Sequence, residues 1–381
     1  MVGFAIAGTW TFLHPIVAEA VRTDALRREA EITEATPTPA ARLLFGFRTT
    51  PYGPQDTEAY RRPDGADAHV FGWLSHSSRS LLYLYGASGA GKSSLMAAGV
   101  LPKLRKDDWL TITARVDEDP EAGLRQALRE AKDVFDTPPP DDTSLADLID
   151  RAAEHARAKG RTTLLVLDQF EEFLILHDEA ERGGLAALLQ DLHDSPRRGF
   201  KLLCVFRTDY RALLYKGGLP PAQDGETSVE LAPFNRRAAQ AFLSQGLPDY
   251  TAAGFDKLFA GLDKIEDARG LYRPITLNMA GLALSRAVEG SAADPGKLID
   301  QYLRDSIAEG PAQDLAPAVL NALITDAGTK APQTVEALTA ATGMKAWHVK
   351  ATLSHLDTRG LVRPQTPDKE RWEIAHDFLA R

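Results

Sequence analysis

Eight consecutive residues have the types and spacing of a phosphate-binding loop. The glycines of such a loop let backbone N–H groups turn toward phosphate oxygens, and the helix that starts near Ser94 adds positive field there. The Lys92 ammonium is expected to reach the β- and γ-phosphates, and the Ser93 hydroxyl to bind Mg²⁺. The eight residues fit the pattern G-x-x-x-x-G-K-[ST] and are Gly86, Ala87, Ser88, Gly89, Ala90, Gly91, Lys92 and Ser93.

A second group of candidate residues follows an apolar run further along the chain. Asp168 comes directly after Leu164–Leu167. A carboxylate at the C-terminal end of a strand beside a phosphate loop can hold Mg²⁺. Glu171 and Glu172 follow, and one of them is expected to polarise the water that attacks the γ-phosphate. The sequence does not choose between the two glutamates.

A third candidate is Arg207, which follows the apolar run Phe200–Phe206. At the tip of a strand next to the phosphate loop, its guanidinium is placed to sense the γ-phosphate. The alternative interpretation is an arginine that caps a helix or forms a salt bridge.

Apolar runs that alternate with helical stretches predict the elements that position these residues. The runs are nearly continuous in hydrophobic residues, which is typical of parallel strands covered on both faces. Helical patterns such as Glu121–Val134 and Ser144–Lys159 lie between them, so we expect a doubly wound α/β domain with a parallel sheet over residues 41–235. The predicted strands are Leu81–Tyr85, Leu110–Val116, Thr162–Leu167, Phe200–Phe206 and Ser228–Leu231.

The pattern changes after Pro233, where the strand signal disappears. Residues 236–310 are expected to form a helical domain, with breaks near Pro248, Gly270 and Pro274.

Residues 311–381 have a third pattern, of three helices followed by two short strands. This order is typical of a winged-helix domain, which we expect here. The helical patterns are Leu315–Ala327, Val335–Thr342 and Lys345–Thr358, and the strands are Leu361–Arg363 and Arg371–Ile374.

The first 40 residues form a separate segment. Residues 2–18 are mostly apolar, but His14 and Pro15 interrupt a run that is short for a membrane span. They are a candidate membrane anchor or, alternatively, a buried or interfacial helix. Arginines follow them, so a span would place the rest of the chain in the cytoplasm. A Thr-Pro-Thr-Pro linker at residues 36–39 precedes the α/β domain.

Composition limits the classes of function. The chain has 381 residues and a net charge of −9 at pH 7, which allows about two or three domains and disfavours a globally basic nucleic-acid binder. Cys204 is the single cysteine, and its apolar surroundings predict a buried side chain. One cysteine excludes an intramolecular disulfide and suits a reducing compartment. We expect a cytoplasmic protein, with or without an anchor to the inner face of the membrane.

Two segments resemble a known family. The run Gly86–Leu104 (GASGAGKSSLMAAGVLPKL) is similar to the phosphate loop and helix of STAND ATPases, in particular the bacterial nSTAND group, and Leu167–Glu172 (LDQFEE) is similar to its acidic strand end. The resemblance extends over residues 45–381. It implies an ASCE-type P-loop NTPase fold in which one strand separates the phosphate-loop strand from the acidic strand, with ATP or ADP and Mg²⁺ as cofactors.

The resemblance adds two candidate nucleotide contacts. Pro274 falls where STAND proteins place a proline against the adenine ring, although a proline at a helix start fits the sequence equally well. His376 falls where a histidine of the winged helix touches the β-phosphate of ADP, although a lone histidine is more often a core or capping residue. The segment His69–Trp73 departs from the family pattern because it has Phe-Gly but no following arginine.

The resemblance implies an ATP-operated signalling switch. ADP would hold the domains closed, a trigger would open them, and ATP would replace ADP before protomers assemble and slow hydrolysis resets the switch. Expected partners are the nucleotide, further copies of the chain, and effector or sensor regions or a protein trigger. The chain ends at Arg381, inside the expected last helix, so we expect a fragment or isolated core of a longer protein.

An alternative interpretation is a motor ATPase, related to AAA+ initiators, that acts on DNA through the winged helix. The expected recognition helix has only Lys345 and Lys350 as fixed positive charges, opposed by Asp357, which disfavours DNA binding. A binding module with a degenerate site is a further alternative, and the intact Lys92 and Ser93 argue against it. The guanine-specific N-K-x-D motif is absent from the sequence, which favours adenine only mildly.

Overall fold

The computed structural model describes most of the chain after residue 46. The described residues fall into two compact units, one from Pro51 to Pro233 and one from Phe234 onward together with the residues before 51. The described ranges are residues 47–48, 50–58, 60–115, 119–137, 139–176, 183–216, 218–266, 269–286, 304, 307, 315–325, 330–358, 361–365 and 369–375.

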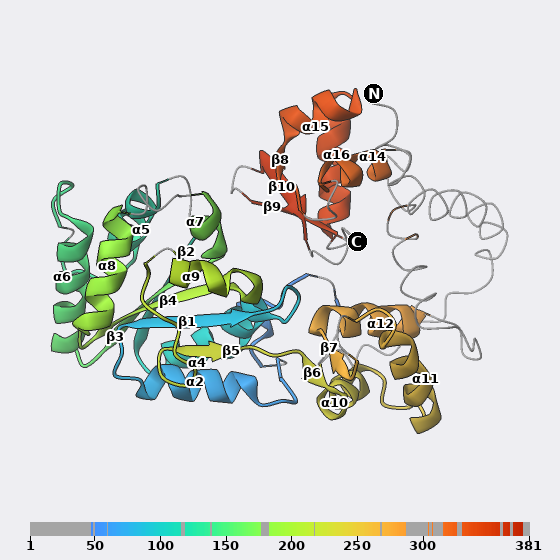
Figure 1. Ribbon diagram of the computed structural model, residues 1–381, viewed down its shortest axis with the longest axis horizontal. Coiled ribbons are helices and arrows are strands. Elements are labelled where there is room, and N and C mark those ends of the chain that lie inside the picture. The colour runs from blue at the N-terminus through green and yellow to red at the C-terminus, as the bar shows by residue number, and fades with distance from the viewer. Residues whose placement is uncertain are drawn as a thin grey trace. The chain divides into compact units, whose positions relative to one another are not determined.

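A five-stranded parallel sheet forms the centre of the first unit (Figure 1). Its strand order is β2-β3-β4-β1-β5, and every neighbouring pair is parallel. All five predicted strands are present, and β4 lies between β1 and β3, as expected for a P-loop NTPase fold. The strands are β1 (Leu81–Gly86), β2 (Trp109–Arg115), β3 (Thr162–Asp168), β4 (Phe200–Arg207) and β5 (Ser228–Glu230).

Helices cover both faces of this sheet (Figure 1). The predicted helix Glu121–Val134 ends early, at Glu130, because Ala131 is extended and Asp133 has a φ of 66°. The helices are α2 (Ala66–His76), α3 (Lys92–Ser94), the π-helical η3 (Leu95–Val100), α4 (Leu101–Lys106), α5 (Pro120–Glu130), α6 (Leu145–Ala158), α7 (Glu171–Leu176), α8 (Gly183–Asp194) and α9 (Arg211–Lys216), with 3-10 turns η2 (Pro54–Asp56) and η4 (Thr208–Tyr210).

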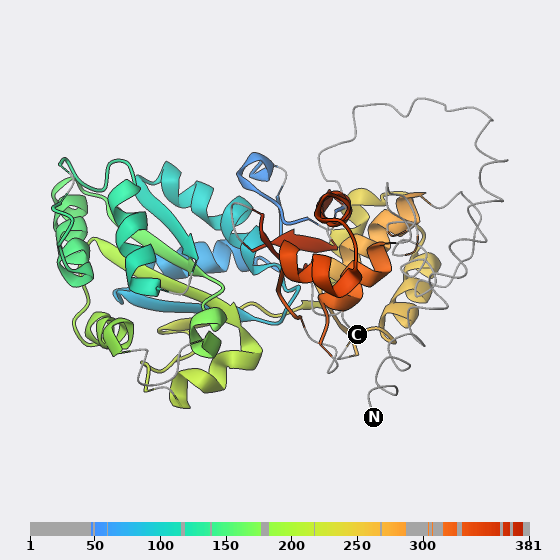
Figure 2. The same ribbon diagram turned by 90° about the horizontal axis from the view of Figure 1, so that it is seen from above.

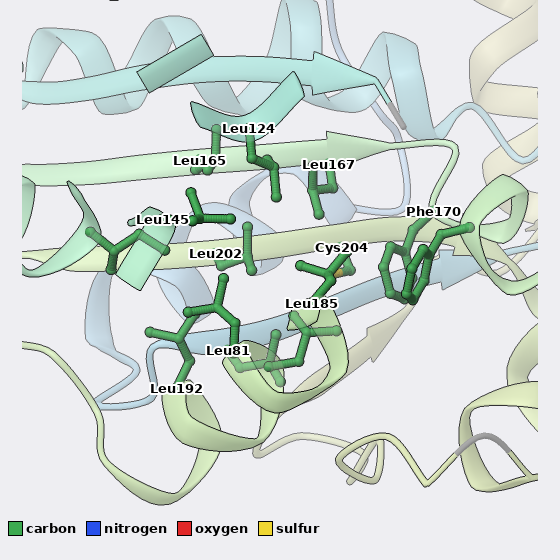
Figure 3. Packing of buried hydrophobic residues seen from close by; sticks show 14 of the residues in the cluster. Leu81, Leu124, Leu145, Leu165, Leu167, Phe170, Leu185, Leu192, Leu202 and Cys204 are labelled. Carbon is green, nitrogen blue, oxygen red and sulfur yellow. The ribbon is translucent and has the colours of Figure 1, made fainter. Parts of the chain in front are cut away.

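Alternate strand residues build two separate cores, because successive β side chains point to opposite faces. Leu202 and Cys204 pack with α5, α6 and α8 on one face (Figure 3). Leu203 and Val205 pack with α2, η3 and α4 on the other face. Burial on both faces explains why the strands are continuous hydrophobic runs. It also fixes the position of the carboxyl ends of the strands, where the candidate site lies.

The residues after Pro233 first form a helical part with its own core. Two strands of two residues each, β6 (Phe234–Asn235) and β7 (Leu271–Tyr272), pair antiparallel. Neither strand was predicted after Pro233, because two-residue strands are too short to leave an alternating pattern in the sequence. The helices are α10 (Arg236–Gly246), α11 (Ala252–Leu262) and α12 (Pro274–Arg286).

Residues 315–375 form three helices and an antiparallel three-stranded sheet around a further core (Figure 2). The three predicted helices and two predicted strands are present, and the first helix is shorter than expected. The sheet has one additional strand, of two residues, that the sequence did not predict. The elements are α14 (Ala316–Ala322), β8 (Gln333–Thr334), α15 (Val335–Thr342), α16 (Ala346–Thr358), β9 (Val362–Pro364) and β10 (Arg371–Ile374), and the sheet order is β8-β10-β9.

The candidate membrane anchor, residues 2–18, lies outside the described residues. Among the helices that the structure describes, none is both long enough and apolar enough to cross a membrane.

Cys204 lies on β4 with its side chain fully buried, as predicted. Burial raises the pKa of its thiol, so both access and thiolate formation are suppressed in the folded state. We expect the native protein to react with a thiol reagent such as DTNB at least ~100-fold more slowly than the denatured protein.

Denatured protein is the control, and it should release one equivalent of chromophore per chain because the sequence has one cysteine. Rapid stoichiometric labelling of the native protein would contradict the burial of β4.

Candidate nucleotide-binding site

The phosphate-binding loop connects β1 to α3, and three of its residues must be glycine for two different reasons. Gly89 and Gly91 have φ angles of 77° and 88°, in the left-handed region that favours glycine. At Gly86 the reason is close approach, since a Cβ there would lie 2.5 Å from the carbonyl oxygen of Leu231. The sequence therefore folds this loop tightly against the end of β5.

Lys92 begins α3 and its side chain lies back along the loop. Its Nζ donates hydrogen bonds to the carbonyl oxygens of Gly86 at 2.8 Å and Ala87 at 3.2 Å. The ammonium is thus held at the mouth of the loop, where a bound β- or γ-phosphate would meet it.

Ser93 and Asp168 come from different elements and meet at the same sheet edge. The Ser93 hydroxyl donates to Asp168 Oδ2 at 3.5 Å. Both are hard oxygen ligands, and Mg²⁺ in phosphate sites takes only one or two protein ligands beside the phosphates and water. Two ligands of this kind therefore suit Mg²⁺ that is bound together with a nucleotide. The described residues contain no group of three or more His, Cys, Asp or Glu that could hold a metal.

The chain turns sharply after Asp168. Gln169 has a φ of 60°, and its backbone N–H donates to Asp168 Oδ1 at 3.0 Å. The next N–H, of Phe170, donates to the carbonyl of Val205 on β4 at 2.9 Å, and the Phe170 ring is fully buried (Figure 3). This left-handed turn, which the sequence analysis missed, fixes Asp168 and starts α7 at Glu171.

The Glu171 carboxyl is close enough to the charged residues of the site to interact with them. Its Oε2 is buried and accepts no hydrogen bond from the described residues. Burial raises the pKa of its carboxyl; Lys92 and Arg207 act in the opposite direction, while Asp168 adds to the rise. These three groups all act on the Glu171 carboxyl, which makes Glu171 our candidate for the base, while the choice between Glu171 and Glu172 stays a prediction.

Arg207 ends β4 directly beside the first residue of the loop. In the β1–β4 register, Arg207 pairs with Gly86. Its guanidinium forms an ion pair with Asp209 and lies 5.3 Å from the ring centroid of Tyr210. The arginine therefore forms the salt bridge of the alternative interpretation, and its role toward a γ-phosphate stays a prediction.

The two contacts suggested by resemblance have different outcomes. Pro274 is the first residue of α12, so the helix-start interpretation is confirmed, and its role against adenine stays a prediction. His376 lies outside the described residues.

Comparison with known proteins assigns the family. Residues 50–247, more than half of the chain, match the Novel STAND NTPase 1 family. The chain belongs to this family. It is therefore a nucleotide-binding P-loop NTPase, as the loop, the acidic strand end and the sheet order indicate. No curated protein matches this STAND NTPase in sequence.

Some solved structures are similar to this STAND NTPase in backbone. The Walker-type ATPase PABY2304 of Pyrococcus abyssi is 16% identical, with 88% of this chain and 98% of that chain covered and a TM-score of 0.48. The ORC2 protein of Aeropyrum pernix, solved in ADPNP-ADP complexes, is 16% identical, with 88% and 93% covered and a TM-score of 0.44. TM-scores this low support no further conclusion about this chain.

In this STAND NTPase the unusual segment His69–Trp73 lies within α2. Val70 is fully buried against the sheet, and the Trp73 indole N–H donates to the carbonyl of Glu226 at 3.3 Å. The segment therefore packs against the sheet through Val70, and Trp73 joins α2 to the turn before β5. The residue from this region that reaches the phosphate loop is instead Arg62, whose guanidinium donates to the carbonyl of Ala90 at 2.9 Å. No motif in the sequence indicated it.

Glu171 and Glu172 form a matched pair of variants for the catalytic base. We expect Glu171→Gln to lower the ATP turnover number by about 100-fold or more, because it removes a carboxylate on which Lys92, Asp168 and Arg207 act. Glu172→Gln should stay within about threefold of the wild type. Phosphate release at saturating Mg·ATP measures both, and a larger loss in Glu172→Gln would contradict the assignment.

The buried environment of Glu171 also predicts a pH dependence. A raised pKa means that the carboxyl takes up a proton at a pH above its ordinary value of about 4.3 as the pH falls. Since the base must be ionised, turnover should fall on the acid side around this raised pKa. A profile of turnover against pH measures the position of this fall, and an acid limb at or below the ordinary glutamate pKa would contradict the prediction.

Proposed function

We propose that this chain is an ATP-operated signalling switch that is closed with ADP and opens for ATP exchange. In the closed state the phosphate loop, Pro274 and His376 hold ADP together. A trigger opens the domains, ATP replaces ADP, protomers associate, and slow hydrolysis returns the chain to ADP. The observation that carries the proposal is the complete set of Lys92, Ser93–Asp168 and buried Glu171 in a member of the STAND family.

The surroundings of Pro274 support its proposed contact with adenine. The preceding Arg273 is buried, and both its backbone N–H and its guanidinium donate to Glu266, at 3.0 and 2.7 Å. The Pro274 carbonyl accepts from the Asn278 side chain at 2.9 Å. A half-exposed proline on a backbone held this firmly offers a rigid apolar surface for a base.

The end of β10 supports the proposed role of His376. Three helices followed by an antiparallel hairpin match a winged-helix domain, and His376 comes next in sequence after this hairpin. The Ala375 N–H donates to Leu361 at 2.9 Å, and its carbonyl accepts from Lys330 Nζ at 3.2 Å. The buried Glu373 pairs with Arg363. A phosphate-sensing histidine needs such fixed support, because loose side chains give weak selectivity.

The switch follows from linkage between nucleotide and conformation. A nucleotide shifts the balance between two states only by its difference in affinity for them. ADP stabilises the closed state only if residues of separate parts, such as Lys92 and His376, contact it in that state and lose contact in the open one.

The charge on α16 argues against the alternative of a motor that acts on DNA. Of the two lysines expected on the recognition helix, Lys345 comes just before α16 and the Lys350 ammonium pairs with the Glu370 carboxylate at 2.7 Å. Lys369 lies 3.9 Å from Asp357. A helix that binds phosphates in DNA needs unpaired positive charge.

Nucleotide content of the purified protein tests the switch. We expect stoichiometric ADP after denaturation and anion exchange, none in Lys92→Ala, and about tenfold weaker ADP retention in His376→Ala, because a charged hydrogen bond to phosphate is lost. His348→Ala, in the same C-terminal part, is the matched control and should retain ADP.

Equal ADP retention in His376→Ala and wild type would contradict the closed state. An empty site with rapid ATP turnover and a strong, salt-dependent shift of duplex DNA would favour the motor.

A further inference from the structure

Arg62 is a buried cation that contacts the phosphate loop from outside the nucleotide site. Its side chain is only 3% exposed. Its Nη1 donates to the carbonyl oxygen of Ala90, a fully buried residue at the turn of the loop, at 2.9 Å. A charge this deeply buried is stabilised by partners that fix its position.

Those partners tie Arg62 to the start of α2. Asp64 accepts in a bidentate manner from Arg62 Nε at 3.0 Å and Nη2 at 2.7 Å. The same carboxylate accepts from the backbone N–H of Ala66, the first residue of α2, at 3.2 Å. The Tyr60 hydroxyl also interacts with Arg62, which lowers the pKa of the hydroxyl, but burial has the larger effect and raises it. The guanidinium therefore has one available orientation, with Nη1 toward the loop.

The contact with the Ala90 carbonyl determines the direction of the next N–H group. In a trans peptide the C=O and the following N–H point in opposite directions, and the structure has no cis peptide among the described residues. Arg62 holds the Ala90 carbonyl, so the Gly91 N–H points the other way. Gly91 has a φ of 88°. Because glycine has the widest choice of backbone conformations, the Ala90–Gly91 peptide would readily leave this conformation without the hydrogen bond from Arg62.

The same segment contacts the far end of the loop. The backbone N–H of Tyr52 donates to Ser94 Oγ at 3.1 Å, one residue after Ser93. Tyr60 lies against Gly99 of the following helix, where a Cβ would come within 2.9 Å of its ring. We call residues 52–67 the strap, because they contact the loop at Ala90 and the helix at both Ser94 and Gly99.

We propose that Arg62 is a positioning residue for nucleotide binding, which orients the Ala90–Gly91 peptide so that the Gly91 N–H faces the phosphates. Through Arg62, the strap thereby preorganises part of the loop before a nucleotide binds. Preorganised donors gain affinity because they are not ordered on binding. The role requires nucleotide binding at the loop but not the closed ADP state.

Affinity for Mg·ADP in Arg62 variants tests this role. In Arg62→Ala the dissociation constant should rise about tenfold, since a hydrogen bond to a charged group is no longer aligned. Arg62→Lys keeps the positive charge but lacks the planar guanidinium, so its dissociation constant should lie between those of the wild type and Arg62→Ala. Titration calorimetry of nucleotide-free protein measures all three.

The ion pair of Lys103 with Asp67, at 2.8 Å, provides the matched control. It also joins the strap to α4, but it does not touch the loop. Lys103→Ala should bind Mg·ADP within about twofold of wild type. Melting temperatures without nucleotide separate stability from positioning, because a purely structural role would move the melting temperature and leave the affinity of the folded fraction unchanged.

Amide exchange of the loop gives a second readout if Arg62→Ala does not fold. Asp64→Asn keeps Arg62 in place but weakens its fixed orientation, so loop peptides around Gly91 should exchange faster and Mg·ADP should bind more weakly. Folded Arg62 variants with wild-type affinity, or an equal loss in Lys103→Ala, would overturn the proposal. Unchanged ADP retention in His376→Ala would overturn the switch and leave the role of Arg62 standing.

Discussion

The hydrogen bonding of β4 to both β1 and β3 is the constraint on which the site depends. β4 is buried on both faces and paired along both edges, so its register fixes the neighbouring strands relative to each other. The register sets Gly86 beside Arg207, and β3 brings Asp168 to the same edge of the sheet. A polyanion then meets the loop, a magnesium ligand and an arginine within one rigid frame, and the protein pays the ordering cost during folding rather than binding.

Charge is distributed over this frame at different depths. Lys92 lies along the mouth of the loop, the half-buried Glu171 interacts with Lys92, Asp168 and Arg207, and Arg62 contacts the loop backbone at Ala90. The buried carboxyl has a raised pKa because it is taken out of water, a common way to tune a base for proton transfer. Some of these charges are thus candidates for direct contact with a nucleotide, whereas Arg62 acts on the backbone of the loop.

The strap and the end of β5 hold the loop at its two ends. Leu231 approaches Gly86 so closely that a side chain there would clash, and its N–H donates to Tyr85. Tyr52 bonds Ser94 at the other end. These contacts explain why a loop with three glycines is ordered, since each flexible residue is adjacent to a fixed one.

The sequence by itself determined the phosphate loop, the acidic strand end, the positions of five strands along the chain and the family, because these depend on local residue types and on hydrophobic runs that burial requires. It determined that Lys92, Ser93 and Asp168 would be available for phosphate and Mg²⁺. Only the tertiary structure showed that Lys92, Asp168 and Arg207 act on the Glu171 carboxyl, because this depends on how the chain turns at Gln169 after Asp168. It alone revealed Arg62, since a hydrogen bond to a backbone carbonyl 28 residues away leaves no pattern in the sequence.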